Sequence, residues 1–176
     1  MKACMIVTNG FEEVETVGTY AILRRGGVEV DIYTLHDTTA TGRFGLCCSD
    51  LHPIQEMRDD YDAIILPGGP QYEELEASEC VQKWLKSYFE ANRYVCALCA
   101  SPTILGHQGY LKGKRYTCFT AMDEDFGGEY VDEYVVRDGT IITGRSAAAS
   151  IAFGFEILCA LMGETHTKQI KESIYY

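Results

Sequence analysis

Basic residues and long apolar runs are scarce in this chain of 176 residues. Lys and Arg number 15 against 26 Asp and Glu, so the formal net charge is −11. Nucleic acids and anionic membrane surfaces attract faces rich in Lys and Arg, so neither is expected as a partner. The acidity also fits solubility alone. The apolar run at residues 2–8 ends in polar and acidic positions without a cleavage site, and no stretch approaches the ~18 apolar residues of a membrane span.

Signatures of cofactor and metal binding are also missing. The chain has neither a G-x-G-x-x-G nor a G-x-x-x-x-G-K-[ST] segment, so no nucleotide site is predicted. No C-x-x-C pair repeats with the spacing of a structural zinc site. The sequence therefore predicts no cofactor and no metal.

The cysteines mostly stand in apolar runs, where a free Cys behaves as a small buried hydrophobe. This usage predicts a reducing, cytoplasmic location. Cys96 and Cys99 form a C-x-x-C, but residues three apart in a strand face opposite sides, which argues against a redox dithiol. The adjacent Cys47 and Cys48 meet the same objection. The eight cysteines are Cys4, Cys47, Cys48, Cys80, Cys96, Cys99, Cys118 and Cys159.

Short β-rich runs alternate with helical patterns and predict a single α/β domain with a doubly wound, mostly parallel, flavodoxin-like sheet and helices on both faces. Strands are expected at residues 2–8, 28–35, 63–66, 94–98 and 115–119, and hairpins at 38–52 and 132–143. Helices are expected at 12–25 and 78–92, from Pro102, and along Ile151 to Met162. The domain is drawn at 1–163, followed by a polar C-terminal tail at 164–176 that is mobile or bound to the surface.

Chemistry is expected where strands end, because ligand sites in such sheets lie at the carboxyl ends of the strands. Cys99 follows an apolar strand and precedes a helix with Pro102 near its start, and small residues build the turn. This arrangement matches a nucleophile elbow, and a helix N-terminus favours the thiolate. The alternative is an inert Cys at a strand end.

Two other strand ends offer supporting groups. The acidic cluster Glu12, Glu13 and Glu15 follows the first strand, and one of its carboxyls turned toward the thiol would serve as acid and base. Acids are also common in a first helical turn, and the pattern does not choose a member. The segment from Pro67 to Gly69 offers backbone N–H groups for an oxyanion hole, or is a plain turn.

The histidines do not support a Cys–His nucleophilic pair. They are scattered and none stands at a strand end near the elbow. The four are His36, His52, His107 and His166.

Several segments in this order resemble the ThiJ/PfpI superfamily, part of the class I glutamine-amidotransferase-like fold, over about residues 1–163. The resemblance is closest to the branch that holds the human parkinsonism-associated deglycase and its bacterial relatives. The segments that carry it are GFEEVET, AILRRGGVEV, YDAIILPGG, ALCASPTIL, LKGKRYTC and DGTIITGRSAAASIAFGFEIL.

The resemblance implies roles for particular residues. It makes Cys99 the nucleophile and Glu15 the acid that hydrogen-bonds it, and it makes the N–H groups of Gly69 and Ala100 the ones that face the thiol. Gly68 belongs to the same pocket. Arg25 matches a position near the usual homodimer interface of the family. Two positions depart from the family pattern, since the usual His is Phe119 and the usual Gly two residues after the nucleophile is Ser101.

The first functional hypothesis is a Cys99-dependent glyoxalase or deglycase that acts on methylglyoxal-type dicarbonyls or their adducts, as the resemblance implies. The alternative is a non-enzymatic stress protein that senses oxidants through Cys99. A cysteine peptidase or amidase is a weaker alternative because its usual His is missing. A small carbonyl or an oxidant is thus the expected partner, together with a second copy of the chain.

Overall fold

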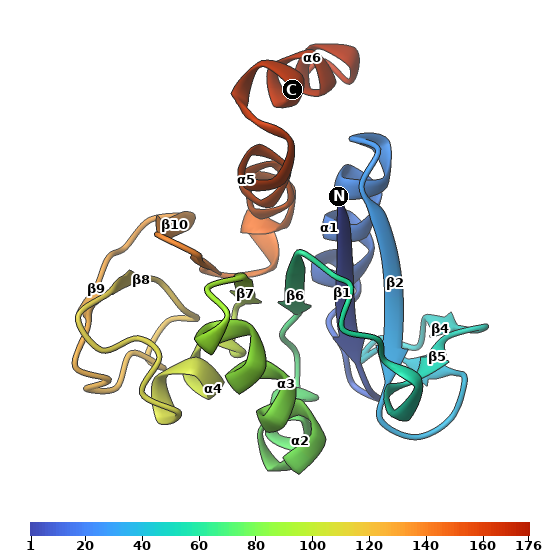
Figure 1. The fold of residues 1–176 in the computed structure, drawn as a ribbon, viewed down its shortest axis with the longest axis vertical. Helices are drawn as coiled ribbons and strands as arrows, with labels where there is room; N and C mark the ends of the chain where they lie inside the picture. The colour runs from blue at the N-terminus through green and yellow to red at the C-terminus, as the bar shows by residue number, and fades with distance from the viewer.

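A seven-stranded sheet forms the centre of the molecule (Figure 1). The computed structural model describes residues 1–176. The strand order is β10-β11-β7-β6-β1-β2-β5, and only β10 and β11 pair antiparallel. The strands are β1 (Lys2–Val7), β2 (Glu29–Thr34), β5 (His52–Pro53), β6 (Ala63–Leu66), β7 (Tyr94–Leu98), β10 (Val135–Asp138) and β11 (Ile141–Gly144). The predicted mostly parallel sheet is confirmed.

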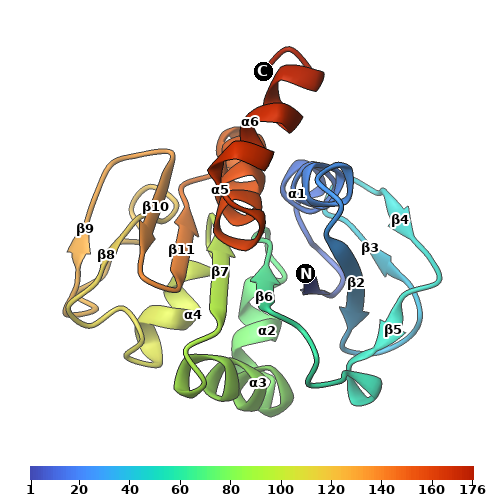
Figure 2. The same cartoon turned by 45° about the horizontal axis from the view of Figure 1, so that its top comes forward.

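Helices cover both faces of this sheet (Figure 2). α1 (Glu13–Arg25) and α5 (Ser150–Met162) pack on one face, and α2 (Tyr72–Ala77), α3 (Glu79–Glu90) and α4 (Pro102–His107) on the other. Side chains of β1 alternate between the two resulting cores, with Met5 on the side of α1 and Ile6 on the side of α3. Because both faces are buried, this strand reads as a continuous apolar run.

The helix predicted over residues 78–92 is present as α3. The structure adds a short helix before it, α2, which the sequence pattern does not predict. Ser78 separates them, since its backbone is extended and its hydroxyl accepts a 3.4 Å hydrogen bond from the N–H of Val81. This serine is therefore the N-cap of α3.

The strand predicted at 115–119 is wrong in its length and its place. β8 (Arg115–Tyr116) pairs with β9 (Glu129–Tyr130) in a separate two-stranded sheet. Beyond β8, the N–H of Thr117 donates to the hydroxyl of Thr143 at 2.9 Å, and the N–H of Phe119 donates to the carbonyl of Cys99 at 2.7 Å. These contacts lead the chain past the ends of β11 and β7.

The segment at 164–176 is largely helical. α6 (Glu164–Ser173) follows α5 after Gly163, whose φ of 87° suits glycine. The ring of Tyr176 lies 4.8 Å from that of Phe155, which folds the end of the chain back onto α5. The longest helices, α1 and α5, have 13 residues each, so no helix is long and apolar enough to cross a membrane.

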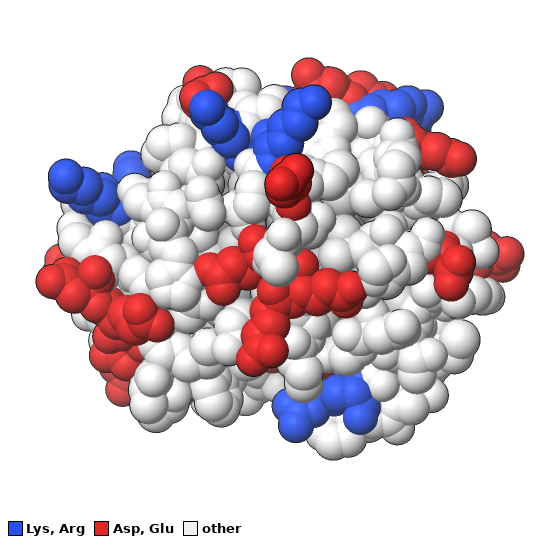
Figure 3. All heavy atoms as spheres, turned by 90° about the horizontal axis from the view of Figure 1, so that it is seen from below, with Lys and Arg blue, Asp and Glu red and all other residues white.

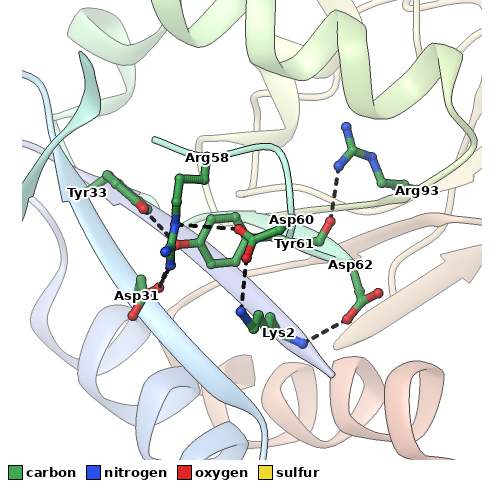
Figure 4. Close-up of polar contacts among 8 residues, drawn as sticks. All are labelled: Lys2, Asp31, Tyr33, Arg58, Asp60, Tyr61, Asp62 and Arg93. Atoms are coloured by element: carbon green, nitrogen blue, oxygen red, sulfur yellow. Dashed lines mark hydrogen bonds and ion pairs between the residues drawn. The ribbon is translucent and has the colours of Figure 1, made fainter. Parts of the chain in front are cut away.

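A polar network ties the loop before β6 to β1 and β2 (Figure 4). The N–H of Lys2 donates to Asp62 at 2.8 Å, and its ammonium contacts Asp60 at 2.9 Å. The hydroxyl of Tyr61 lies 2.5 Å from Asp31 and 2.6 Å from the hydroxyl of Tyr33. Because these contacts join neighbouring strands, they help to fix the register that brings the carboxyl ends of β1, β6 and β7 together.

Candidate active site

Cys99 stands on a sharp turn between β7 and α4. Its φ is 64°, a left-handed conformation that costs a non-glycine residue roughly 1–2 kcal/mol. The N–H of Cys99 donates to the carbonyl of Gly144 at 2.8 Å, and its own carbonyl accepts from the N–H of Phe119 at 2.7 Å. These bonds hold the strained backbone in place, as is common at functional sites.

Glu15 is the member of the acidic cluster that faces the thiol. It lies in the first turn of α1 and is fully buried. Its Oε2 accepts a 2.7 Å hydrogen bond from the N–H of Gly68, while the buried Oε1 has no hydrogen-bond partner. Burial raises the pKa of Glu15 to about 7, against the opposing effects of the Gly68 N–H and the Cys99 thiol.

The other two glutamates have different tasks. Glu12 is the N-cap of α1, and its Oε2 accepts from the N–H of Glu15 at 2.9 Å. Glu13 accepts from the N–H of Phe44 at 2.6 Å and so anchors the hairpin of β3 (Ala40–Thr41) and β4 (Cys47–Cys48). The three carboxyl groups thus have different partners because they point in different directions around the start of α1.

The expected lowering of the thiol pKa by a helix N-terminus is not found. Burial, and next the nearby carboxylate of Glu15, raise the pKa of Cys99. The N–H groups of Ala100 and Gly69 act in the opposite direction but do not outweigh them. α4 has only six residues, so its dipole is small. A thiolate at Cys99 is therefore favoured only when Glu15 holds the proton.

Two main-chain N–H groups influence the thiol. Those of Gly69 and Ala100 favour the thiolate and so lower the pKa of Cys99, and neither donates to a main-chain carbonyl. Gly69 has a φ of 90°, and a Cβ there would lie 2.5 Å from the carbonyl oxygen of Gly10. A Cβ on Gly68 would lie 2.8 Å from the Cβ of Cys99. Glycine at residue 68 therefore lets the loop approach Cys99 closely, and glycine at residue 69 lets it approach the segment after β1.

Two hydrogen bonds to the carbonyl of Pro67 hold this loop in place. The carbonyl accepts a 2.8 Å hydrogen bond from the hydroxyl of Ser101 and another from the side-chain amide of Gln71 at 2.8 Å. Gln71 in turn accepts from the N–H of Thr8 at 2.7 Å, which ties the loop to β1. Ser101 therefore joins the elbow to the loop and does not present its hydroxyl to the thiol. The role of Gln71 is not apparent from the sequence, since no pattern distinguishes it from an ordinary polar residue.

Phe119 and Arg43 lie beside the site. Phe119 is 45% exposed and adjoins Cys99 through its main-chain bond. Arg43 extends from the β3–β4 hairpin, and its charge lowers the pKa of Glu15 slightly. No sequence pattern points to Arg43, because only the fold of the hairpin brings it near Glu15.

The four histidines are engaged elsewhere. His36 contacts Glu74, His107 contacts Glu76 and Glu124, His166 contacts the carbonyl of Gly26, and the ring of His52 packs near that of Tyr33. None of them is among the groups that affect the ionisation of Cys99.

The remaining predicted positions lie apart from the thiol. Arg25 is exposed in the last turn of α1, about 15 Å along the helix axis from Glu15. All eight cysteines are free. No group of His, Cys, Asp or Glu side chains is placed to hold a metal ion.

The face at the carboxyl ends of the strands is acidic. Figure 3 looks at the molecule from the end toward which β1 and β6 point in Figure 1, and Asp and Glu side chains cross the middle of that view. α2 lies at this end and carries Glu73, Glu74 and Glu76. Such a face disfavours the approach of anions and leaves neutral molecules unaffected.

Known proteins share both this sequence pattern and this fold. A family model described as the DJ-1/PfpI family matches residues 1–160. A protein of Pyrococcus horikoshii named a deglycase is 32% identical over 152 residues, which are 84% of this chain and 92% of that protein. The protein of Drosophila melanogaster named dj-1beta is 28% identical over 179 residues, 98% of this chain and 96% of that protein.

Solved structures agree with the sequence matches. A crystal structure of a DJ-1 superfamily protein from Salmonella typhimurium has a TM-score of 0.94 at 29% identity and covers 99% of this chain and 98% of its own. The crystal structure of Drosophila melanogaster DJ-1beta has a TM-score of 0.91 at 27% identity and covers 99% and 97%. The chain belongs to the DJ-1/PfpI family.

Proposed function

We propose that the chain is a cysteine-dependent enzyme of the glyoxalase or deglycase kind, acting on methylglyoxal-type dicarbonyls or their adducts. The observation that carries this proposal is the pairing of Cys99 with the buried Glu15, whose Oε1 is left free to exchange a proton. A carboxyl with a pKa of about 7 is suited to both accepting and donating a proton near neutral pH. The names of relatives such as the Pyrococcus horikoshii deglycase support the same assignment.

The reaction begins with attack of the Cys99 sulfur on the aldehyde carbon of methylglyoxal. The thiol proton passes by way of Glu15 to the aldehyde oxygen, which gives a hemithioacetal. The N–H groups of Gly69 and Ala100 stabilise the negative charge that develops on this oxygen. The chemistry requires no metal and no organic cofactor.

Glu15 then moves a proton between the two substrate carbons. Its carboxylate removes the hydrogen from the former aldehyde carbon, and the resulting enediol is protonated at the neighbouring carbon. The product at this stage is a thioester of lactate with Cys99. Water cleaves the thioester, releases lactate and restores the thiol, so that one methylglyoxal and one water give one lactic acid.

The test is lactate formation from methylglyoxal without added glutathione. Turnover is expected in the wild type and is expected to be lost in Cys99→Ser and Glu15→Gln. Cys80→Ser and Glu13→Gln are matched controls, since Cys80 lies on α3 and a glutamine at residue 13 still accepts from Phe44. Wild-type turnover no higher than that of Cys99→Ser would overturn the proposal.

A second candidate is favoured by the aromatic residue at position 119, where family members often carry a His. Without a histidine the site is less equipped for proton transfer, yet the two N–H groups and Glu15 are suited to bind a sulfinate on Cys99. This redox-responsive protein would be oxidised by peroxide at Cys99 without turning over dicarbonyls. The lactate assay separates the two candidates, because only the enzyme shows turnover. A peptidase or amidase has less support, because no histidine affects Cys99.

We further propose that the protein is a cytoplasmic homodimer. The eight free cysteines fit a reducing compartment. Exposed apolar side chains gather on α1 and on the adjoining β3–β4 hairpin, namely Val14, Val17, Phe44 and Leu46. Arg24 and Arg25 continue the exposed side of α1 beyond them. Apolar groups in this number on one surface favour contact with a second copy.

A further inference from the structure

A cavity lies between α5 and α6, far from Cys99. Its volume is about 570 Å³, within the range of small-molecule sites. Figure 1 places α6 at the opposite end of the molecule from α2 and α4, which flank the carboxyl ends of the strands. The cavity therefore has no part in the proposed reaction at Cys99.

The two sides of this α5–α6 cavity differ in chemistry. The side formed by α5 and β10 is mainly apolar and includes Val135, Ala152, Phe155 and Cys159. The side formed by α6 is polar. Its residues Glu164, Lys168 and Lys171 follow one another at helical spacing and so share one face of the helix. A ligand that fills the cavity must be amphipathic.

Lys171 is the cation that remains free to bind such a ligand. Its ammonium lies 5.1 Å from the centre of the Phe155 ring and 5.3 Å from that of Tyr176. No carboxylate comes within ion-pair distance of Lys171, whereas Lys168 pairs with Glu172 at 3.9 Å. The cation–π contacts leave the N–H donors of Lys171 available.

The two glutamates that line the cavity do not neutralise the positive charge of Lys171. Glu156 pairs with Arg137 at 3.5 Å. Glu164 precedes Lys171 by seven residues, about 10 Å along the axis of α6. An anionic group that binds Lys171 therefore lies next to the exposed ring of Tyr176 and about two helical turns from Glu164.

We propose that the α5–α6 cavity binds a small organic anion with an aromatic body, such as an aryl carboxylate or sulfonate. The anionic group contacts the ammonium of Lys171. The aromatic body packs on the exposed ring of Tyr176 and against Ala152. This binding site is separate from the proposed enzyme site and does not depend on its activity.

The probe for the test is 8-anilinonaphthalene-1-sulfonate, titrated into the full chain and followed by its fluorescence. Saturable binding is expected in the wild type, with affinity reduced about tenfold or more in Lys171→Gln and retained in Lys171→Arg. Ala152→Phe, which fills the cavity, is expected to abolish binding. Lys86→Gln on α3 is the matched control and is expected to bind as the wild type does, because Lys86 lies outside the cavity.

N-phenyl-1-naphthylamine is a neutral analogue of the probe. It lacks the sulfonate and is expected to bind more weakly than 8-anilinonaphthalene-1-sulfonate. Dicarbonyl turnover, or its absence, is expected to be the same in Lys171→Gln and the wild type. Equal sulfonate affinity in the wild type and Lys171→Gln, or equal affinity for the neutral analogue, would overturn the proposal. So would probe binding that falls as protein concentration rises, since a second copy would then cover the cavity.

Discussion

The main-chain N–H of Gly68 lies 2.7 Å from Oε2 of Glu15 and donates a hydrogen bond to it. This bond joins the first turn of α1 to the loop after β6, while the buried Oε1 has no hydrogen-bond partner. Glu15 is fully buried, and the Cys99 thiol is among the groups that influence its pKa. The position of one proton in the Glu15–Cys99 pair therefore depends on a contact between segments that are 53 residues apart in the sequence.

The buried Glu15 predicts a pH-dependent stability. Its pKa is about 7 in the folded protein and about 4.5 when exposed to water, so between these values the unfolded chain loses a proton that the folded chain keeps. The contribution of Glu15 to stability is thus full below pH 4.5, is lost as pH rises to about 7, and does not change further above that. We expect Glu15→Gln to gain in unfolding free energy over the wild type across this window, by up to about 3 kcal/mol.

Urea denaturation at several pH values measures this difference, because the titration of other groups is common to both proteins. Glu13→Gln is the control, since it removes a carboxyl from the same turn of α1. A difference between Glu15→Gln and the wild type that stays constant from about pH 4.5 to 7 would contradict the raised pKa.

The closeness of Gly68 to the nucleophile predicts that Gly68→Ala impairs the site. The added Cβ would lie 2.8 Å from the Cβ of Cys99 and 2.8 Å from Oε2 of Glu15, so the loop and the elbow must move apart. We expect a loss of Cys99-dependent turnover of about 100-fold or more, since small displacements of reacting groups have effects of this size. Alkylation of Cys99 by iodoacetamide is expected to change in rate as well.

Gly18→Ala is the control for this variant. A Cβ at residue 18 would lie 3.4 Å from the Cβ of Ser150, an ordinary contact, and alanine favours the helix. Circular dichroism shows whether both variants fold. Turnover and alkylation of Gly68→Ala equal to those of the wild type would refute the close approach of this loop.

The exposed apolar side chains of α1 and the β3–β4 hairpin predict the dimer interface. Val17→Asp and Phe44→Asp each place a charge on this surface, and we expect each to convert a dimer to a monomer in sedimentation velocity. Phe89→Asp on α3 is the control, because Phe89 is also exposed but lies on the other face of the sheet. A monomeric wild type, or dimers that persist in both variants, would contradict the proposal.

The sequence predicts the central strands well because each is buried on both faces and reads as an unbroken apolar run, as in β1 and β6. The turn at Cys99 is also readable, since small residues and Pro102 mark it. The choice among Glu12, Glu13 and Glu15 is not, because it depends on the rotation of α1 against the sheet. Gln71 and Arg43 reach the site through tertiary contacts of a loop and a hairpin, which leave no periodic signal.

The contacts of His107 predict a second pH-dependent contribution to stability. Here carboxylates stabilise the charged form of the group, whereas at Glu15 burial disfavours the charged form. Its Nδ1 contacts Glu76 and its Nε2 lies 3.2 Å from Glu124, so both ring nitrogens face carboxylates. These contacts, with Glu76 first, raise the pKa of His107 above its usual 6.5, although partial burial opposes them. The imidazolium of His107 thus links α4 to α2 and to the loop that carries Glu124. The ring of Phe126, from the same loop, packs against the His107 ring.

The sign of the effect follows from the raised pKa. Stabilisation by His107 is complete below pH 6.5 and is lost as pH rises through the pKa of the folded state. We expect the advantage of the wild type over His107→Gln in unfolding free energy to shrink as pH rises above 6.5, by less than about 1 kcal/mol because the ring is partly exposed. His166→Gln is the control, since His166 contacts only the carbonyl of Gly26. An advantage that stays constant, or that shrinks equally in the control, would show that the two carboxylates do not hold a proton on His107.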